Sequence, residues 1–310
     1  MLSTPDTANE HARAAATKVA GSRRPLRFLV AAMLAGMWIG IGVTLMFSAA
    51  GPFDAVGSPA TRLVSGAVFA IALTFVVFAG GELATSAMMI LPIGALRRTI
   101  TSWQAARTLV FVFLGNLAGS LLFAWVLVQT GILHSPATAG MLDGLLESKM
   151  GHSATEMLFG GILCNVLVSG AIWAASRVRS ETAKAIIIFW GVLGFIAAGF
   201  EHVVANMTIY GLGILGGASV DVSWAAFGSS MLWVGLGNLI GGMVVIGLAY
   251  AFVGGRTAEA SNGEDEDPLA EAERELADVD ARLALELHRA DVRAGHPAWR
   301  SSGVQDSDAS

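Results

Sequence analysis

The stretch Gly199–Phe200–Glu201–His202–Val203–Val204–Ala205–Asn206–Met207 places three polar side chains inside a long hydrophobic region. Apolar residues lead into it from 185 to 198 and follow it from 208 to 215. Ionisable groups at membrane depth are costly and usually face a cavity or a substrate path. Glycine at 199 lets the backbone open there. The stretch predicts an interrupted transmembrane helix that carries His202 as its working residue. The alternative is a continuous helix with a structural Glu–His pair.

The composition of the chain is that of an integral membrane protein. Of its 310 residues, 54% are hydrophobic and 14% are charged, whereas soluble domains carry about 25% charged residues. The single cysteine, Cys164, excludes a disulfide framework. The net charge of −5 arises from acidic residues concentrated near the C-terminus. Nothing in the sequence indicates a nucleic-acid partner or a cofactor.

Six hydrophobic segments are long enough to cross a bilayer, which takes about 20 helical residues. They run over residues 28–50, 63–96, 108–128, 157–176, 185–215 and 222–253. Basic residues gather before the first segment, between the second and third, between the fourth and fifth, and after the sixth: Arg23, Arg24, Arg27, Arg97, Arg98, Arg107, Arg177, Arg179, Lys184 and Arg256. Because such residues favour the cytoplasmic side, both termini are expected there.

The two halves of the chain contain matching motifs. Gly115–Ser120 (GNLAGS) in the third segment corresponds to Gly237–Gly242 (GNLIGG) in the sixth, and Gly81–Glu82 in the second corresponds to Phe200–Glu201 in the fifth. Each half holds three segments, so the second half is expected to be inverted relative to the first. Two interrupted helices at matching positions favour a pathway at the membrane midplane over the structural Glu–His pair.

Small residues recur at spacings that allow helices to approach closely. Glycine pairs four residues apart occur at 36 and 40, at 115 and 119, and at 237 and 241. We interpret them as packing sites and not as chemistry.

The ends of the chain differ from its centre and predict three parts: an N-terminal cytoplasmic segment (1–22), a six-span domain (23–254) and an acidic cytoplasmic tail (255–310). The N-terminal segment could be a surface helix or disordered. Within the tail, residues 269–294 predict an amphipathic helix that ends at Gly295 and Pro297. Its leucines at 269, 276 and 283 leave a short coiled coil and a solvated single helix as alternatives.

The motifs together resemble those of the formate/nitrite transporter family of bacterial membrane channels, over about residues 23 to 253. The matching stretches are 81–86, 115–120, 161–165, 199–207 and 237–242. The resemblance implies an all-α membrane protein with an aquaporin-like protomer, in which helices two and five are broken. It also implies a homopentamer in the inner membrane, with a pore for small monovalent anions or their conjugate acids in each protomer, and no enzymatic activity. The Asn-Pro-Ala signature of aquaporins is absent from the sequence.

The resemblance also assigns roles to residues of the pathway. The central histidine corresponds to His202 and the loop threonine to Thr85. Supporting roles fall to Glu201, Asn165, Asn206 and Glu82. The outer constriction corresponds to Phe69 and Phe195, the inner one to Leu73 and Val168, and a basic residue of the outer vestibule to Lys149. The chain departs from the family at Ala84, where a bulky apolar residue such as Phe is common. This difference is expected to leave the inner constriction wider or differently closed, so that larger acids such as acetate or lactate become candidate substrates.

These residues suggest how an anion would cross. Desolvation makes an anion costly in an apolar constriction, whereas a neutral acid crosses with less difficulty. We expect Lys149 to raise the local anion concentration, and His202 to hydrogen-bond the anion and pass it a proton. Attraction by a protonated His202 is the alternative mechanism. Glu201 is expected to face backbone donors and Asn165, because a carboxylate would repel an anion.

Several other functions remain as alternatives. The channel could carry acetate, lactate or hydrosulfide instead of formate or nitrite. A membrane metal site or enzyme would use Glu82, Glu201 and His202, but a metal needs three or four ligands with supporting contacts, and no His-x₃-His pair is present. A membrane anchor for the acidic tail is a further alternative, in which the tail and not the pore carries the function.

Overall fold

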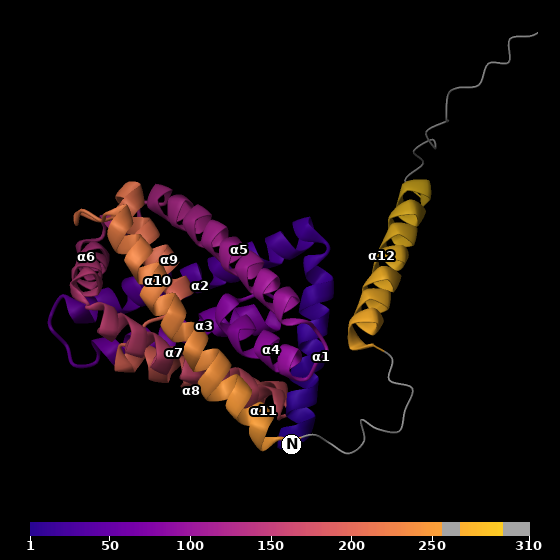
Figure 1. Cartoon of the computed structure of the whole chain (residues 1–310). Helices are drawn as coiled ribbons and strands as arrows, with labels where there is room; N and C mark the ends of the chain where they lie inside the picture. The colour runs from indigo at the N-terminus through magenta and orange to yellow at the C-terminus, as the bar shows by residue number, and fades with distance from the viewer. Residues whose placement is uncertain (256–266, 294–310) are drawn as a thin grey trace, which may run out of the picture.

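The computed structural model describes residues 1–255 and 267–293, and all of the regular structure in these ranges is helical (Figure 1). Six helices there are long and apolar enough to span a membrane. They are α2 (Pro25–Asp54), α3 (Thr61–Phe78), α5 (Ser102–Gln129), α7 (Ala154–Ser176), α8 (Glu181–Ala198) and the last span, Trp224–Val253. The last span comprises α10 (Trp224–Ile240), the π-helical η3 (Gly241–Leu248) and α11 (Ala249–Val253). The six segments predicted from hydrophobicity are therefore confirmed.

Two of the predicted segments are broken, as expected. The second divides into α3 and the short α4 (Ala84–Leu96), and the fifth divides into α8 and α9 (Val203–Leu212), which continues into η2 (Gly213–Gly217). A glycine with positive φ turns the chain at each break, Gly80 at 81° and Gly199 at 79°. Glycine adopts this backbone conformation without the steric cost of a Cβ, so each long helix can end inside the hydrophobic region.

The two halves pack in equivalent ways around the predicted glycines. In the first half α5 packs on α2, and a Cβ at Gly119 would lie 2.1 Å from the carbonyl oxygen of Met33. In the second half α10 packs on α7, and a Cβ at Gly237 would lie 2.2 Å from the carbonyl oxygen of Leu158. Since only glycine fits such distances, the packing role predicted for these residues holds in both repeats.

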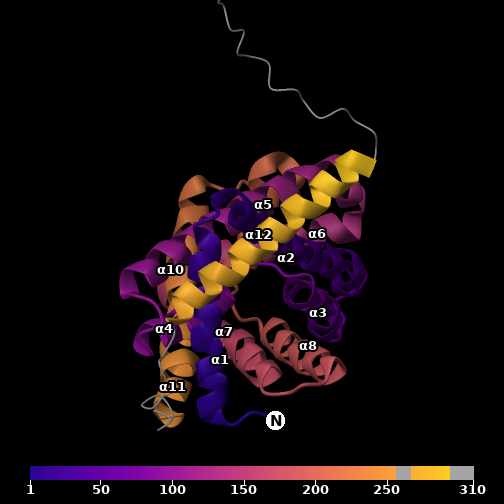
Figure 2. The same cartoon turned by 90° about the vertical axis from the view of Figure 1, so that its right-hand side faces the viewer.

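Residues at the N-terminus form a helix, α1 (Thr4–Ser22), which lies across one end of the spans and packs on α4 (Figures 1 and 2). An alanine-rich face of α1 is buried there. The imidazole of His11 stacks on the indole of Trp173 at 5.2 Å, and Trp173 stacks on Tyr250 at 4.6 Å. The sequence left a surface helix and a disordered segment as alternatives for residues 1–22, and the structure shows the helix.

Three further elements complete the described chain. The 3₁₀ helix η1 (Ile132–His134) and the helix α6 (Pro136–Gly151) join the two halves at the end opposite to α1 (Figure 1), and the hydrophobicity pattern did not predict them. The tail helix α12 (Pro268–Arg293) matches the predicted 269–294 closely and crosses over α1 (Figure 2). The predicted stop at Gly295 and Pro297 lies outside the described residues.

Candidate functional site

The two helix breaks meet in the interior of the protein. Thr85 lies in the first turn of α4, and His202 immediately precedes α9. The Thr85 Oγ1 and His202 Nε2 atoms are 3.2 Å apart, and both side chains are buried, with exposed fractions of 0% and 3%. Both helices therefore direct their N-termini, the positive ends of their dipoles, toward one polar site. A helix N-terminus of this kind favours an anion.

The position of His202 fixes which ring nitrogen carries its proton. His202 is the N-cap of α9, and its Nδ1 accepts the backbone N–H of Ala205 at 3.1 Å. An acceptor nitrogen carries no proton, so the neutral ring has its hydrogen on Nε2, which donates to Thr85 Oγ1. The hydroxyl hydrogen of Thr85 is then available to another acceptor.

Two asparagines that the sequence analysis left unassigned hold the breaks open. Asn116 Oδ1 accepts the N–H of Ala84, the first residue of α4, at 2.8 Å, and its Nδ2 donates to the carbonyls of Ala32 and Glu82. Asn238 Oδ1 accepts the N–H of Val203, the first residue of α9, at 2.9 Å. The repeated Gly-Asn-Leu motif was the signal that could have identified them.

The second amide repeats the bonding of the first. Asn238 Nδ2 donates to the carbonyls of Gly161 and Glu201, at 2.7 and 2.9 Å. Each amide thus satisfies backbone groups that the missing helical turn would otherwise leave unpaired inside the membrane. Asn165 ties the two halves together, since its Nδ2 donates to the carbonyls of Thr85 and Asn238.

A cavity of about 430 Å³ leads from the α6 end of the protein to His202, and we call it the vestibule. Its wall includes Phe69, Phe195 and Lys149. The rings of Phe69 and Phe195 meet edge to face at 6.0 Å, and Phe195 stacks on the imidazole of His202 at 5.6 Å. The two aromatic residues assigned to the outer constriction therefore lie together, and Phe195 lies directly against the histidine.

Glu201 forms the polar floor of the vestibule. Its Oε2 accepts from Lys149 Nζ at 2.6 Å and from Asn206 Nδ2 at 2.8 Å, and its Oε1 lies 3.5 Å from His152 Nδ1. The expectation that Glu201 faces backbone donors and Asn165 was wrong, because the side chains of Lys149 and Asn206 bond its carboxylate. Asn165 Nδ2 instead donates to backbone carbonyls of both halves. A buried carboxylate needs a cation nearby, and Lys149 at the C-terminal end of α6 supplies it.

His152, which follows α6, was not among the predicted residues. It lines the vestibule, and about a third of its side chain is exposed. The Glu201 carboxylate, 3.5 Å from Nδ1, raises the pKa of His152 above its ordinary value, against the opposing effects of partial burial and of the Lys149 charge. No sequence motif marked this residue, because its partners come from elements distant in the chain.

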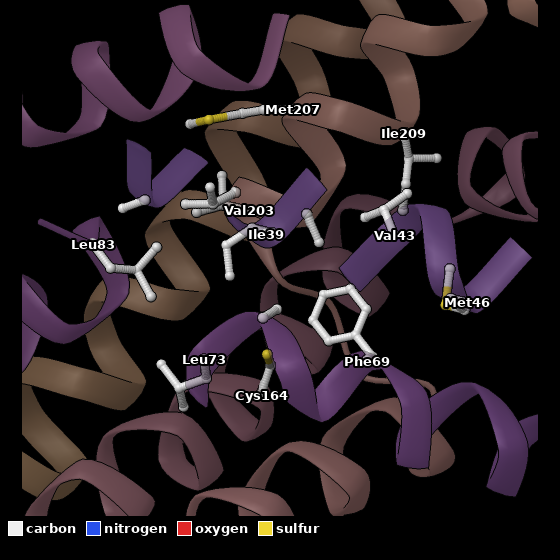
Figure 3. Close-up of a cluster of buried hydrophobic side chains, with 14 of the residues drawn as sticks. Ile39, Val43, Met46, Phe69, Leu73, Leu83, Cys164, Val203, Met207 and Ile209 are labelled. Atoms are coloured by element: carbon white, nitrogen blue, oxygen red, sulfur yellow. The ribbon is translucent and has the colours of Figure 1, made fainter. Parts of the chain in front are cut away.

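The other end of the site is apolar. Leu73, one turn beyond Phe69 on α3, and Val168 on α7 are both buried in the central hydrophobic cluster, part of which is drawn in Figure 3. Ala84 is also fully buried there. Glu82, expected to support the break, forms an ion pair with Lys18 of α1. The vestibule does not include Leu73, Val168 or Ala84.

Within the described residues, no three histidine, cysteine or acidic side chains are grouped as a metal site would require. What the described chain contains is a multi-pass arrangement of helices in which two half-spanning helices meet at a buried polar site. Such discontinuous helices at a midplane are typical of membrane transport proteins.

The chain belongs to the formate/nitrite transporter family, whose family model matches residues 5–252. It is 39% identical to the nitrite transporter NirC of Salmonella typhimurium over 279 residues, which cover 86% of this chain and 98% of that protein. It is 31% identical to the formate channel FocA of Haemophilus influenzae, over 81% of this chain and 94% of that protein.

Solved structures give the same assignment. An FNT family ion channel is 38% identical and superposes with a TM-score of 0.73, covering 80% of this chain and 98% of the other. A pentameric formate channel with formate bound is 25% identical, with a TM-score of 0.65, covering 74% of this chain and 98% of the other. The predicted family and fold are confirmed: the chain is an all-helical, multi-pass membrane protein, and its relatives are transporters and channels and not enzymes.

Proposed function

We propose that this protein conducts small monovalent anions, or their conjugate acids, through a pore in each protomer of a homopentamer. The observation that carries the proposal is that the vestibule reaches His202, whose ring lies 3.2 Å from Thr85 where the N-termini of α4 and α9 converge. The names of the relatives support small anions as the cargo, and the pentameric formate channel supports the assembly.

In the proposed path an anion enters past Lys149 and His152, passes Phe69 and Phe195, and meets Thr85 and His202. The hydroxyl hydrogen of Thr85 is its first hydrogen-bond donor, and the Nε2 hydrogen of His202 becomes a second donor when the anion displaces Thr85 Oγ1 from it. The positive ends of α4 and α9 offset part of the desolvation cost. Leu73 and Val168 then form the apolar barrier on the α1 side, and Glu201, Asn165, Asn206 and Glu82 support the site without contacting the anion.

The capping bond of His202 bears on the proton-transfer mechanism. The neutral imidazole donates from Nε2 but cannot give up that proton at ordinary pH, so transfer to an anion requires the doubly protonated ring. A second proton on Nδ1 would remove the acceptor that caps the Ala205 N–H. The geometry therefore supports His202 as a neutral hydrogen-bond donor in the resting state, and any proton transfer opens the first turn of α9.

The cargo is proposed to be nitrite or formate, and the higher identity to the nitrite transporters supports nitrite first. Acetate, lactate and hydrosulfide remain alternatives because of Ala84. This residue begins α4 beside the barrier, so Ala84→Phe is expected to narrow the path. Its test is a panel of these anions on wild type and Ala84→Phe, in which a loss confined to acetate and lactate would identify Ala84 as the filter.

The test of the central site is anion flux into proteoliposomes, with two substitutions at one position. His202→Asn keeps a side-chain acceptor for the N-cap of α9 but removes the ring, and His202→Ala removes both. We expect both variants to lose most of the nitrite flux, while only His202→Ala loses about 1 kcal/mol of stability. His134→Gln, in η1, is the matched control. Unchanged flux and pH dependence in His202→Asn would contradict the proposal.

The surroundings of the protein follow from the same proposal. We place the six spans in the lipid bilayer of the inner membrane, with both termini and α1 on the cytoplasmic side and the vestibule outside. The basic residues on the α1 side support this orientation. Native mass spectrometry of the detergent-solubilised protein tests the pentamer, and labelling of cysteines introduced at Ser58 and Ser180 from either side of the membrane tests the orientation.

A further inference from the structure

His152 lies where one protonation changes the charge that an entering anion meets. It stands between α6 and α7 at the floor of the vestibule, beside the carboxylate of Glu201. The other oxygen of that carboxylate is bonded to Lys149. The opposite charges of Lys149 and Glu201 cancel formally, so the floor has no net charge while His152 is neutral.

We propose that His152 is a proton-controlled charge switch of the vestibule, which makes its floor net positive when the outside is acidic and so increases capture of the anion. The proposal rests on the anion-channel function above and adds its regulation from outside. It assigns to His152 a role separate from that of His202, whose Nδ1 caps α9 and whose Nε2 faces Thr85.

The charged groups around His152 decide whether it can titrate in this way. Glu201 from the break and Glu156 from the start of α7 favour its protonated form, whereas Lys149 from α6 opposes it. Asp54 at the end of α2 and Arg62 on α3 line the same vestibule with opposite charges. Glu156 is held by the capping box of α7, in which it bonds the N–H and hydroxyl of Ser153.

Geometry gives the added proton a defined place. Nδ1 of His152 lies 3.5 Å from Glu201 Oε1 and has no closer hydrogen-bond partner among the described residues. Protonation at Nδ1 supplies a donor to that oxygen and leaves the second ring nitrogen as a further donor. Because the pKa of His152 is raised above its ordinary value of about 6.5, His152 gains its proton earlier than a free histidine as the outside is acidified.

The size of the effect follows from the interaction of one added charge with an anion. One unit charge about 4 Å from an anion in bulk water changes the occupancy of the anion roughly fivefold. Screening by salt lowers this factor, so we expect about a two- to fivefold effect at physiological ionic strength.

The experiment compares nitrite flux in proteoliposomes of wild type and His152→Gln, with equal pH on both sides, from about pH 8 to about pH 6. At each pH both proteins meet the same fraction of protonated nitrite, so the ratio of their fluxes isolates His152. We expect the ratio of wild type to His152→Gln to rise about two- to fivefold on acidification, and more at low salt than at high salt. A ratio that stays constant over this range would overturn the proposal.

Two further variants keep the result interpretable. His134→Gln, at the same end of the protein but outside the vestibule, is expected to follow wild type at every pH. His152→Lys carries a permanent charge and is expected to show a flux ratio to His152→Gln that no longer depends on pH. A pH-dependent ratio in His152→Lys would overturn the switch. Failure of the channel function itself would look different, as an absence of anion flux in wild type.

Discussion

At the scale of single residues, the side chains at the vestibule floor compensate the charge of one buried carboxylate. Glu201 is nearly inaccessible, and its bonds to Lys149 and Asn206 replace the water that it loses. The mutual attraction of such a pair roughly offsets the desolvation of both ions, but removal of one partner leaves an uncompensated charge. The floor is therefore sensitive to single substitutions and tolerant of paired ones.

We expect Lys149→Met to destabilise the protein by about 3–5 kcal/mol, because Glu201 would stay buried without its cation. Adding Glu201→Gln should restore most of this loss, since a neutral amide needs no counter-charge. Thermal unfolding of the detergent-solubilised protein measures both effects. Equal melting temperatures for Lys149→Met and the double variant would show that the ion pair does not set the stability of the floor.

At the scale of the helices, the repeats are held together where small residues bring backbones into contact. The α2–α5 and α7–α10 pairs both place a glycine against a carbonyl oxygen of the neighbouring helix. Without a hydrophobic driving force between helices in lipid, this close packing supplies much of their association. The same glycines also bring Asn116 and Asn238 close enough to cap the broken helices.

Gly237→Ala tests this packing, because its new methyl group would lie 2.2 Å from the Leu158 carbonyl oxygen. We expect α10 to shift away from α7 and the protein to lose about 1–3 kcal/mol of stability, together with flux. Gly228→Ala on the same helix is the matched control, since nothing lies within 4 Å of its added carbon. If the two variants melt at the same temperature, close approach at Gly237 is not what holds α10.

The docking of α1 is expected to depend on pH through His11. Burial, and secondarily the charge of Lys18, lower the pKa of His11 from 6.5 to about 4. Between pH 6.5 and about pH 4, His11 therefore binds a proton more readily when α1 is undocked than when it is docked. Docking is fully stable above pH 6.5 and weakens as the pH falls toward 4, by up to about 3 kcal/mol.

Distance measurement between spin labels at Glu10 and Arg179 tests the docking of α1. We expect the distance distribution of wild type to broaden as the pH falls from about 6.5 to about 4. The distribution of His11→Phe should stay narrow, since this variant keeps an aromatic ring on Trp173 but has no proton to gain. Broadening in both proteins would assign the change to another group.

At the scale of the whole molecule, the described part of α12 contacts the channel chiefly through α1. Asp280 pairs with Arg24 and Arg27, and Glu273 pairs with Arg23. Leu269 packs against the hydrophobic cluster that α1 forms with α4. Exposed ion pairs of this kind contribute about 0–1 kcal/mol each. The match to the family model ends at residue 252, before α12 begins.

Removal of residues 255–310 is therefore expected to leave the six spans folded and the flux per protomer within about twofold of wild type, because the tail contributes only such weak contacts. Proteoliposome flux and the melting temperature, compared with those of the full chain, check this. Loss of flux on truncation, with an intact fold, would favour the reading in which the tail carries the function.

Much of this architecture could be read from the sequence. Hydrophobic length determined the six spans, because a bilayer of fixed thickness requires it. Repeated Gly-Asn-Leu and glutamate motifs in halves of three spans determined the inversion and the two breaks, since an odd number of crossings reverses the second half. Local patterns of this kind act within one helix, and they identified His202 and the packing glycines. Thr85 was assigned through the resemblance to the family. The roles proposed for the pathway residues stay predictions until flux is measured.

The partners of these residues were decided only by the tertiary structure. Asn116 and Asn238 bond the first residues of helices that lie 32 and 35 residues away in the sequence. Lys149 and His152 contact Glu201, which lies on a distant segment of the chain. The helix α6 lies in a connection without a strong hydrophobic pattern. Hydrogen bonds and ion pairs between distant segments depend on how the helices cross. Local periodicity does not predict how the helices cross. Once the helices are packed, these contacts form because an unpaired polar group is costly inside a membrane.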